Sequence, residues 1–401
     1  MTDRLYYDDA YLWSFNGTVI AEKEDRGIWV ALDQSAFYPT SGGQPYDTGT
    51  LSYGGKQIKV ENVEADREGT VWHLVSQSIR AGTSVLGQID GERRLDHMEQ
   101  HGGEHLLAGV IWEKLRGITI GLHLGKEDST IDVELPDGRI HLTEEEIEML
   151  EETVNKRIRS DAPIRCWFPS EPELKTLPLR KEPAVTEHIR IVAMGDFEMV
   201  ACGGTHPAST GRIGQLKILS TVPSKGKIRF SFVCGERAER VFRRCMPSAR
   251  KAGNVLSCPM EKLASSAGEL KAKLAEATRR LNEYETKRVL EEIRENEDTE
   301  SLNGITVSVT ILKEGEAKAI TEAVNRYIDE DGRVLLLSVG ERLTFARSRD
   351  VNLDMNELIR RVGRGGGRPE IAGGAGIPQC ADVAKKILVT EGKNRQWRKK
   401  N

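Results

Sequence analysis

The sequence predicts an α+β protein of several domains, and three observations support this fold class. A chain of 401 residues is longer than one typical domain. Short runs of β-branched and aromatic residues, separated by glycine and aspartate turns, fill residues 1–90, whereas residues 91–250 mix strand-like runs with amphipathic helical patterns. Beyond residue 258 the pattern becomes a long polar helix and then a further mixed α/β unit. These changes predict four parts, namely 1–90, 91–250, 251–300 and 301–401.

The composition is that of an ordinary globular protein. Hydrophobic residues make up 38% and charged residues 30%, so the chain can bury a sizeable core. No apolar run approaches the roughly 18 residues that cross a membrane, and the first residues lack a signal-peptide pattern. Six scattered cysteines in so long a chain do not resemble a disulfide framework. We therefore expect a cytoplasmic protein without a membrane partner.

Charge is unevenly distributed along the chain. The net charge of −4 argues against indiscriminate nucleic-acid binding. Residues 127–152 nevertheless contain eleven Asp or Glu against one Arg, and residues 212–251 contain eleven Lys or Arg against two Glu. The last eleven residues add five basic groups and one acid. This segregation fits an electrostatic surface for a polyanion, and it fits solvated helix faces equally well.

Residues 1–90 predict a small β-barrel. Strand-like runs alternate with turns at 17–20, 27–32, 56–63 and 69–75. A glycine-rich stretch, FYPTSGGQPYDTG, occupies residues 37–49. Its glycines permit close approach of a ligand, and Thr40, Ser41 and Gln44 offer polar side chains. Taken alone, the stretch fits a tight turn between strands better than a binding site.

Two pairs of metal-ligand residues, each pair separated by three residues, lie about a hundred residues apart. His101 and His105 occur in HGGEH on a predicted helix at 96–116, where positions i and i+4 share one face. Cys202 and His206 occur in CGGTH, whose glycines allow a tight turn. A His/His/Cys/His set suits Zn²⁺. We therefore expect one zinc ion per chain, held by both segments.

The role of that zinc stays open at this point. Four protein ligands are typical of a structural zinc, whereas a catalytic zinc commonly has three ligands and a water. The glycines beside the ligands would leave space for an approaching molecule. His97, one turn before His101, could compete as a ligand, support the site or contact a substrate. Glu104 could act as a general base, but its position off the ligand face favours a solvated helix carboxylate.

The middle of the chain predicts elements that flank the second ligand pair. A capping box of Thr143 and Glu146 opens a helix that runs to about residue 159. The proline-rich stretch 163–183 is expected to be a loop. Strands are expected at 189–193, 198–201 and 227–234. Between 263 and 284, apolar residues keep a 4-3 spacing for about three heptads, which fits a coiled-coil dimer or a helical hairpin.

The last hundred residues predict a separate α/β unit. Strands are expected at 305–312, 333–339 and 343–347, with helices at 316–328 and 354–362. The run GRGGGRPEIAGGAG at 363–376 precedes a predicted helix at 380–388. A glycine run with two arginines before a helix is a candidate phosphate cradle, although it matches neither the P-loop nor the dinucleotide fingerprint.

Together, HGGEHLL, CGGTH, FYPTSGGQPYDTG and GRGGGRPEIAGGAG resemble the editing module of alanyl-tRNA synthetase and the free-standing alanyl-tRNA editing proteins. The resemblance covers nearly the whole chain. It implies a β-barrel, an α+β zinc-containing editing domain, a helical arm and a C-terminal α/β DHH-associated domain. Gly102 and Gly103 depart from the family, which usually has Thr and Ala there. The departure puts in doubt a contact by that Thr hydroxyl, but no metal ligand.

The resemblance implies hydrolysis of the ester between tRNA-Ala and a wrong amino acid, serine or glycine. An alanine pocket excludes these two poorly, so a second sieve is needed. Gln44 and Thr40 would contact the substrate, and the zinc at His101, His105, Cys202 and His206 would activate water or orient the terminal adenosine. The basic tail would assist tRNA contacts made by Arg364, Gly365, Gly366, Gly367 and Arg368. A homodimer through the helical arm or the C-terminal domain is a further expectation.

Two other functions compete with editing. A DHH phosphoesterase needs an Asp-His-His motif, which the chain lacks, since Met98 follows Asp96-His97. A non-catalytic tRNA- or RNA-binding protein with a structural zinc fits the same ligands. A full synthetase is not expected, because the chain begins with the barrel and leaves no room for a preceding aminoacylation domain.

Overall fold

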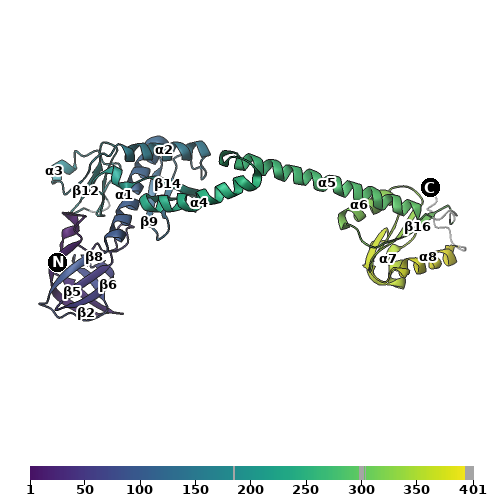
Figure 1. Ribbon diagram of the computed structural model, residues 1–401, viewed down its shortest axis with the longest axis horizontal. Helices are drawn as coiled ribbons and strands as arrows, with labels where there is room; N and C mark the ends of the chain where they lie inside the picture. Colours follow the sequence, from purple (N-terminus) through teal and green to yellow (C-terminus); the bar gives the residue numbers. More distant parts are fainter. Residues whose placement is uncertain (184–185, 298–301, 303, 393–401) are drawn as a thin grey trace. The chain divides into compact units, whose positions relative to one another are not determined.

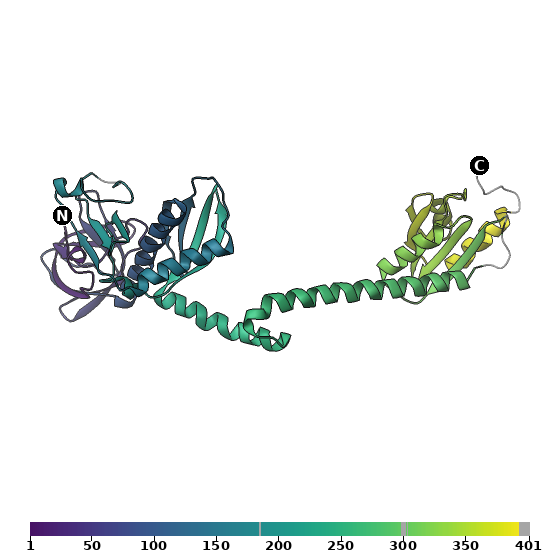
Figure 2. The same cartoon turned by 90° about the horizontal axis from the view of Figure 1, so that it is seen from above.

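The computed structural model describes residues 1–183, 186–297, 302 and 304–392. The chain divides into two compact units, Met1–Ser248 and Ala249–Asn401, and both mix strands with helices (Figures 1 and 2). The expectation of a multidomain α/β chain is thus confirmed. Within the described ranges, no helix has the length and apolar character needed to cross a membrane.

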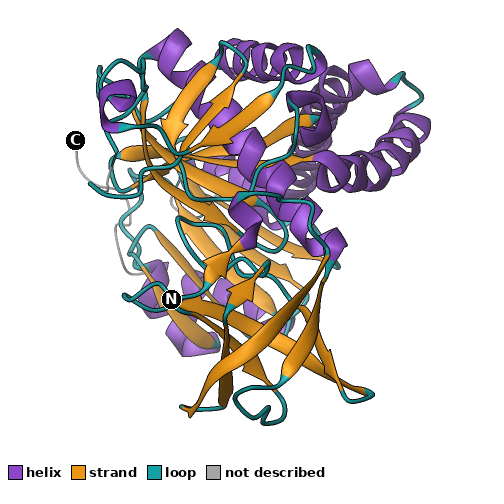
Figure 3. Cartoon of the chain, turned by 90° about the vertical axis from the view of Figure 1, so that its left-hand side faces the viewer, coloured by secondary structure: helices purple, strands orange, loops and turns teal. Residues whose placement is uncertain are grey.

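The first unit begins with a closed six-stranded barrel (Figure 3). Before it, β1 (Asp3–Arg4) pairs in parallel with β4 (Gln34–Ser35), and the short helix η1 (Leu5–Tyr7) follows β1. Alternate residues of the barrel strands point inward and form an apolar core. Around the barrel the order is β2 (Ser14–Glu24), β3 (Ile28–Leu32), β7 (Val71–Val75), β6 (Lys56–Ala65), β5 (Gly49–Tyr53) and β8 (Ser84–Ile89).

A long buried helix, α1 (Gly91–Leu115), follows the barrel and packs on an antiparallel sheet. It starts five residues before the predicted helix, because Asp90 caps it by accepting from the Arg93 N–H. The helix α2 (Glu144–Arg159) packs beside α1, with the predicted capping box in place. The sheet has the order β14 (Leu216–Ser224), β15 (Lys227–Cys234), β10 (Ser129–Glu134) and β9 (Ile118–Leu124).

A smaller sheet carries the second ligand pair. It has the antiparallel order β11 (Ile164–Trp167), β12 (Ile191–Met194) and β13 (Glu198–Ala201). The loop predicted for 163–183 is therefore wrong in part, because it contains β11 and the short helix α3 (Glu171–Leu174). Pro163 precedes β11, and Pro172 lies in the first turn of α3, where a proline is tolerated. A turn of helix, η2 (Thr210–Ile213), lies between this sheet and β14, and α4 (Gly235–Leu256) follows β15.

The second unit contains a five-stranded sheet and the helix α5 (Leu263–Glu295), which follows η3 (Met260–Lys262). The end of α5 packs on α6 (Ala317–Ile328) through Val289 and Ile293. Helices α7 (Met355–Val362) and α8 (Gln379–Gly392) complete the core. The sheet order is β16 (Thr306–Leu312), β17 (Arg333–Val339), β18 (Arg342–Arg347), β20 (Ile371–Ala375) and β19 (Arg364–Gly367).

Two expectations for this unit change. The run at 363–376, expected as a candidate phosphate cradle, contains β19 and β20, which pair as an antiparallel hairpin with Gly365 opposite Gly374, and the expected helix follows it as α8. The heptad positions of α5 are open to solvent, with Leu274 66% and Tyr284 72% exposed. No described residue of this chain covers these heptad positions, so the helical hairpin is not supported. The alternative, a dimer seam, stays a prediction.

Candidate metal centre

Four side chains from two distant segments converge in the first unit. The potential ligand atoms of His101, His105, Cys202 and His206 all lie within 4.8 Å of one another. The Nε2 atoms of His101 and His206 each lie 3.4 Å from the Cys202 Sγ. The two histidines of α1 stand one turn apart, and the other pair lies in the loop after β13. The structure thus brings together the four residues that the sequence pairs as ligands.

The backbone of the CGGTH loop is held close to α1. A Cβ at Gly204 would lie 2.2 Å from the His101 Cε1, so only glycine fits there. The Arg190 guanidinium donates to the carbonyl oxygens of Cys202 and Gly204, at 3.2 and 2.9 Å. The Gly204 N–H points at the Cys202 sulfur, 3.4 Å away. These contacts fix the direction of the thiol and of the loop that follows it.

Gln44, from the glycine-rich stretch, is fully buried against the ligands. Its Oε1 lies 2.8 Å from the His101 Nδ1 and accepts from the Thr205 N–H at 3.2 Å. Its Nε2 donates to the Thr205 hydroxyl at 2.8 Å. A carbonyl beside Nδ1 selects the tautomer that leaves Nε2 free for a metal. The side chain of Gln44 therefore orients a ligand and ties the barrel to the second ligand pair.

Thr40 lies apart from this cluster. Its side chain is exposed, and its backbone N–H donates to the Val63 carbonyl. In the described part of the chain, no hydrogen bond joins Thr40 to the four ligand residues. Gln44 and Thr40 thus occupy different environments, although only four residues separate them in the motif.

Burial sets the protonation of the ligands. It lowers the pKa of His101 to about 3 and holds the pKa values of His105 and His206 well below their usual range. All three imidazoles are therefore neutral near pH 7. Burial raises the pKa of the Cys202 thiol to about 12, so an incoming metal must displace its proton. Three neutral, buried imidazoles and one half-buried thiol fit Zn²⁺.

Two further titratable groups of α1 differ from their expected environments. Glu104 is 8% exposed and not a solvated carboxylate, and burial raises its pKa to about 7. The nearby Arg180 guanidinium pairs with the buried Glu198 at 2.7 Å. His97 is also buried, which lowers its pKa to about 4, but it is not one of the four converging residues. The geometry therefore gives no support for His97 as a competing metal ligand.

A buried ion pair, which the sequence reading missed, anchors the start of α1 to the barrel. Arg94 and Asp47 are fully buried, and the Arg94 Nε donates to both carboxylate oxygens at 3.0 and 3.1 Å. Arg94 also donates to the carbonyl of Ala36, and the Asp47 carboxylate accepts from the Tyr38 N–H. Asp47 lies in the same glycine-rich stretch as Gln44. The glycine-rich stretch thus contacts the start of α1 through Asp47 and the candidate ligand His101 through Gln44.

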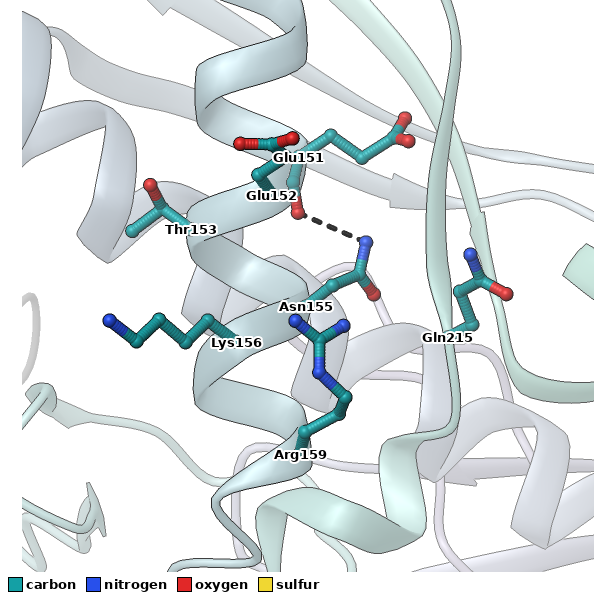
Figure 4. A pocket seen from close by; sticks show the side chains of 7 residues that line it. All are labelled: Glu151, Glu152, Thr153, Asn155, Lys156, Arg159 and Gln215. Carbon is teal, nitrogen blue, oxygen red and sulfur yellow. Dashed lines mark hydrogen bonds between the residues drawn. The ribbon is translucent and has the colours of Figure 1, made fainter.

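A separate open pocket of about 510 Å³ lies along α2 and does not include the metal centre (Figure 4). Asn155 donates to the carbonyls of Glu151 and Leu216, and the Glu151 carboxylate accepts from Lys217. These groups join α2 to β14. The pocket is lined by Glu151, Glu152, Thr153, Asn155, Lys156, Arg159 and Gln215.

The residues expected to contact tRNA belong to the second unit. Arg364, Gly365 and Gly367 are exposed on the edge strand β19, and Arg368 is exposed in the turn that follows it. Gly366 is half-buried in the same strand. The basic tail at 393–401 lies outside the described residues. The contact of these residues with tRNA stays a prediction.

Comparison with known proteins identifies what the chain resembles. Residues 11–93 match the family described as tRNA synthetases class II (A), and residues 189–231 match the threonyl and alanyl tRNA synthetase second additional domain. An exonuclease RecJ structure bound to manganese aligns over 35% of this chain and 38% of its own, at 17% identity and a TM-score of 0.28, which is too low to support an argument.

Two curated relatives extend along nearly the whole chain. The alanine–tRNA ligase of Pyrococcus abyssi is 31% identical over 96% of this chain, which spans 42% of that enzyme's length. The alanyl-tRNA editing protein AlaX-L of Pyrococcus horikoshii is 29% identical over 97% of this chain and 98% of its own length. The resemblance of this chain to alanyl-tRNA editing proteins, and to the corresponding part of alanine–tRNA ligases, is therefore confirmed.

Proposed function

We propose that this protein hydrolyses the ester that joins a wrong amino acid, serine or glycine, to tRNA-Ala. One observation carries the proposal: the glycine-rich stretch and both ligand pairs meet at one buried centre through Gln44 and His101. The similarity to AlaX-L along the whole of both chains supports it, because that relative is named as an alanyl-tRNA editing protein. Serine is the first substrate to test and glycine the second.

The chain's own residues prepare this centre. His101, His105, Cys202 and His206 would hold one Zn²⁺, which supplies Lewis-acid polarisation of water or of the ester, or orients the terminal adenosine. Gln44 keeps the Nε2 of His101 available as a ligand atom. The three histidines are buried, which strengthens electrostatic interactions on their side of the site. Serine recognition would need a group that hydrogen-bonds its hydroxyl; the resemblance to the editing proteins gives Gln44 and Thr40 as substrate contacts, and of these two Thr40 has the exposed side chain.

The second unit would bind the tRNA body. Two exposed arginines, Arg364 at the start of β19 and Arg368 directly after it, suit phosphate contact. We propose that this unit is the DHH-associated domain of the editing proteins. On this proposal the first unit performs the chemistry, and the second unit sets the affinity for tRNA.

A deacylation assay tests the function. Purified protein is mixed with Ser-tRNA-Ala, Gly-tRNA-Ala or Ala-tRNA-Ala, and release of the amino acid is followed over time. We expect serine or glycine to be released and alanine to be spared. The Cys202→Ala variant should lose bound zinc and turnover together, whereas the control Cys245→Ala, at an exposed cysteine of α4, should keep both.

The assay also separates editing from the competing function. A tRNA-binding protein with a structural zinc would bind the three aminoacyl-tRNAs without releasing any amino acid. The four-ligand set favours this alternative more than a three-ligand set would. Absence of turnover in zinc-loaded wild-type protein would reject the proposed hydrolysis. Turnover that persists in metal-free Cys202→Ala protein would reject a catalytic role for the metal.

A further inference from the structure

An exposed aromatic side chain and its neighbours border the metal centre. Phe168, directly after β11, is 49% exposed. Its ring meets the partly exposed Tyr7 ring edge to face, with the centroids 5.5 Å apart. The Tyr7 hydroxyl in turn lies beside the metal loop, since a Cβ added at Gly203 would meet it at 3.4 Å. Gly203 is exposed and directly follows the ligand Cys202. A path of two rings therefore leads outward from the ligands.

Two arginines flank these rings. The guanidinium carbon of Arg190 lies 5.2 Å from the Tyr7 ring centroid, and that of Arg4 lies 5.9 Å away. Arg4 also donates to the Tyr7 hydroxyl at 3.3 Å. Arg190 is 6% exposed, and within the described ranges it forms no ion pair with a carboxylate. Among the described residues, the Arg190 guanidinium contacts two carbonyl oxygens, the Cys166 thiol and the Tyr7 ring, and it pairs with no carboxylate.

Exposed aromatic rings beside arginines are the usual means of binding unpaired nucleotides. The base stacks on a ring, and the cation lies near the phosphate, with little dependence on sequence. Binding of a protein partner to Phe168 would not require a buried arginine without a carboxylate partner, such as Arg190, beside the Tyr7 ring. The ligand chemistry of this edge is therefore that of a single-stranded nucleotide.

We propose that Phe168 and Tyr7 form a stacking shelf for the unpaired base next to the aminoacylated nucleotide. Phe168 offers its exposed ring to that base, Tyr7 holds Phe168 against the metal loop, and Arg4 faces the adjoining phosphate. The shelf would place the ester at the metal centre by fixing the nucleotide that precedes it. This inference rests on the proposed function, because it takes the acceptor end of a tRNA as the ligand.

The test measures binding, so that it does not depend on hydrolysis. The probe is an uncharged RNA hairpin that ends in the single-stranded acceptor sequence, labelled for fluorescence anisotropy. A second hairpin lacks only the base of the penultimate nucleotide. Phe168→Ala should weaken binding of the intact hairpin about tenfold, because one stacked base contributes on that order. Phe168→Trp should retain the affinity. The control Phe242→Ala, at a 38% exposed phenylalanine of α4, should bind like wild type.

The abasic hairpin decides which base is bound. If the shelf holds the penultimate base, wild type and Phe168→Ala bind the abasic hairpin equally, so the two changes are not additive. Equal affinity of both proteins for the intact hairpin overturns the shelf. An identical loss on both hairpins also overturns it, because the ring would then contact something else. Bound zinc, measured in every variant, should not change. Failure of the proposed hydrolysis with a positive binding result would leave the shelf intact and reject only the enzymatic function.

Discussion

Single residues at the metal centre differ in the protons they carry. The pKa of Cys202 is raised to about 12, whereas the pKa of His101 is lowered to about 3. At pH 8 the thiol is therefore protonated and the imidazole neutral. Zinc binding should release about one proton per ion, all of it from Cys202. A pH indicator in weak buffer measures this release, and the Cys202→Ser variant should release none. Release of two or more protons would show that a histidine is cationic in the metal-free protein.

The second prediction at this scale concerns Gln44. Because its Oε1 orients the ring of His101, Gln44→Leu should lower the zinc affinity about 10- to 100-fold. A competition with a chelator measures the affinity. Gln88→Leu, at an exposed position of β8, serves as the control. If Gln44→Leu binds zinc normally yet loses only turnover, Gln44 contacts the substrate and not the ligand.

Residue spacing predicted the four candidate ligands that the fold brings together, but it did not reveal their surroundings. The i, i+4 pair and the glycine-flanked CGGTH specify ligand chemistry locally. The charges that act on the buried Glu104 include those of Arg180 and Glu198, which come from the segment before β12 and from β13. The residue spacing within α1 gives no information about those two residues, so the expectation that Glu104 is a solvated carboxylate was wrong. The glycine-rich motif pointed to Gln44 in the sequence, whereas the hydrogen bond between Gln44 and His101 became visible only in the fold.

Among the elements, the strongly patterned ones were predictable. Helix α2 has its capping box at Thr143, and β17 is a continuous apolar run. The strands β5 and β8 were missed because they are short and mix polar residues with glycine. No strand was predicted in the glycine run, because β19 forms by pairing with β20 and not through a side-chain preference. Tertiary pairing, and not local propensity, forms these elements.

The junction of barrel and helix yields a prediction about stability. Arg94 and Asp47 are both fully buried, so removing one leaves an uncompensated charge. Asp47→Asn should lower the free energy of unfolding by about 3–5 kcal/mol, as measured by urea denaturation. The double variant Asp47→Leu with Arg94→Met removes both charges and should recover much of this loss. Equal losses in the single and double variants would show that the hydrogen bonds from Arg94 to carbonyls dominate.

At the scale of the whole molecule, the chain consists of two units with separate cores. The sequence predicted four parts, and that finer division stays a prediction. The four ligands and their supporting residues all lie in the first unit, whereas Arg364 and Arg368 lie in the second. Chemistry and tRNA binding should therefore be separable by truncation.

A chain of residues 1–257, which ends after α4, tests this separation. It should fold cooperatively, bind one zinc ion and deacylate substrate at saturating tRNA with nearly the wild-type kcat. Its KM for tRNA should rise, and the dependence of binding on salt should become less steep, since each lost phosphate contact removes roughly 0.7–0.9 from the slope of log K against log salt. The double variant Arg364→Ala, Arg368→Ala in the full chain should reproduce part of this slope change with unchanged zinc. An unchanged salt slope in the truncated protein would assign tRNA binding to the first unit alone.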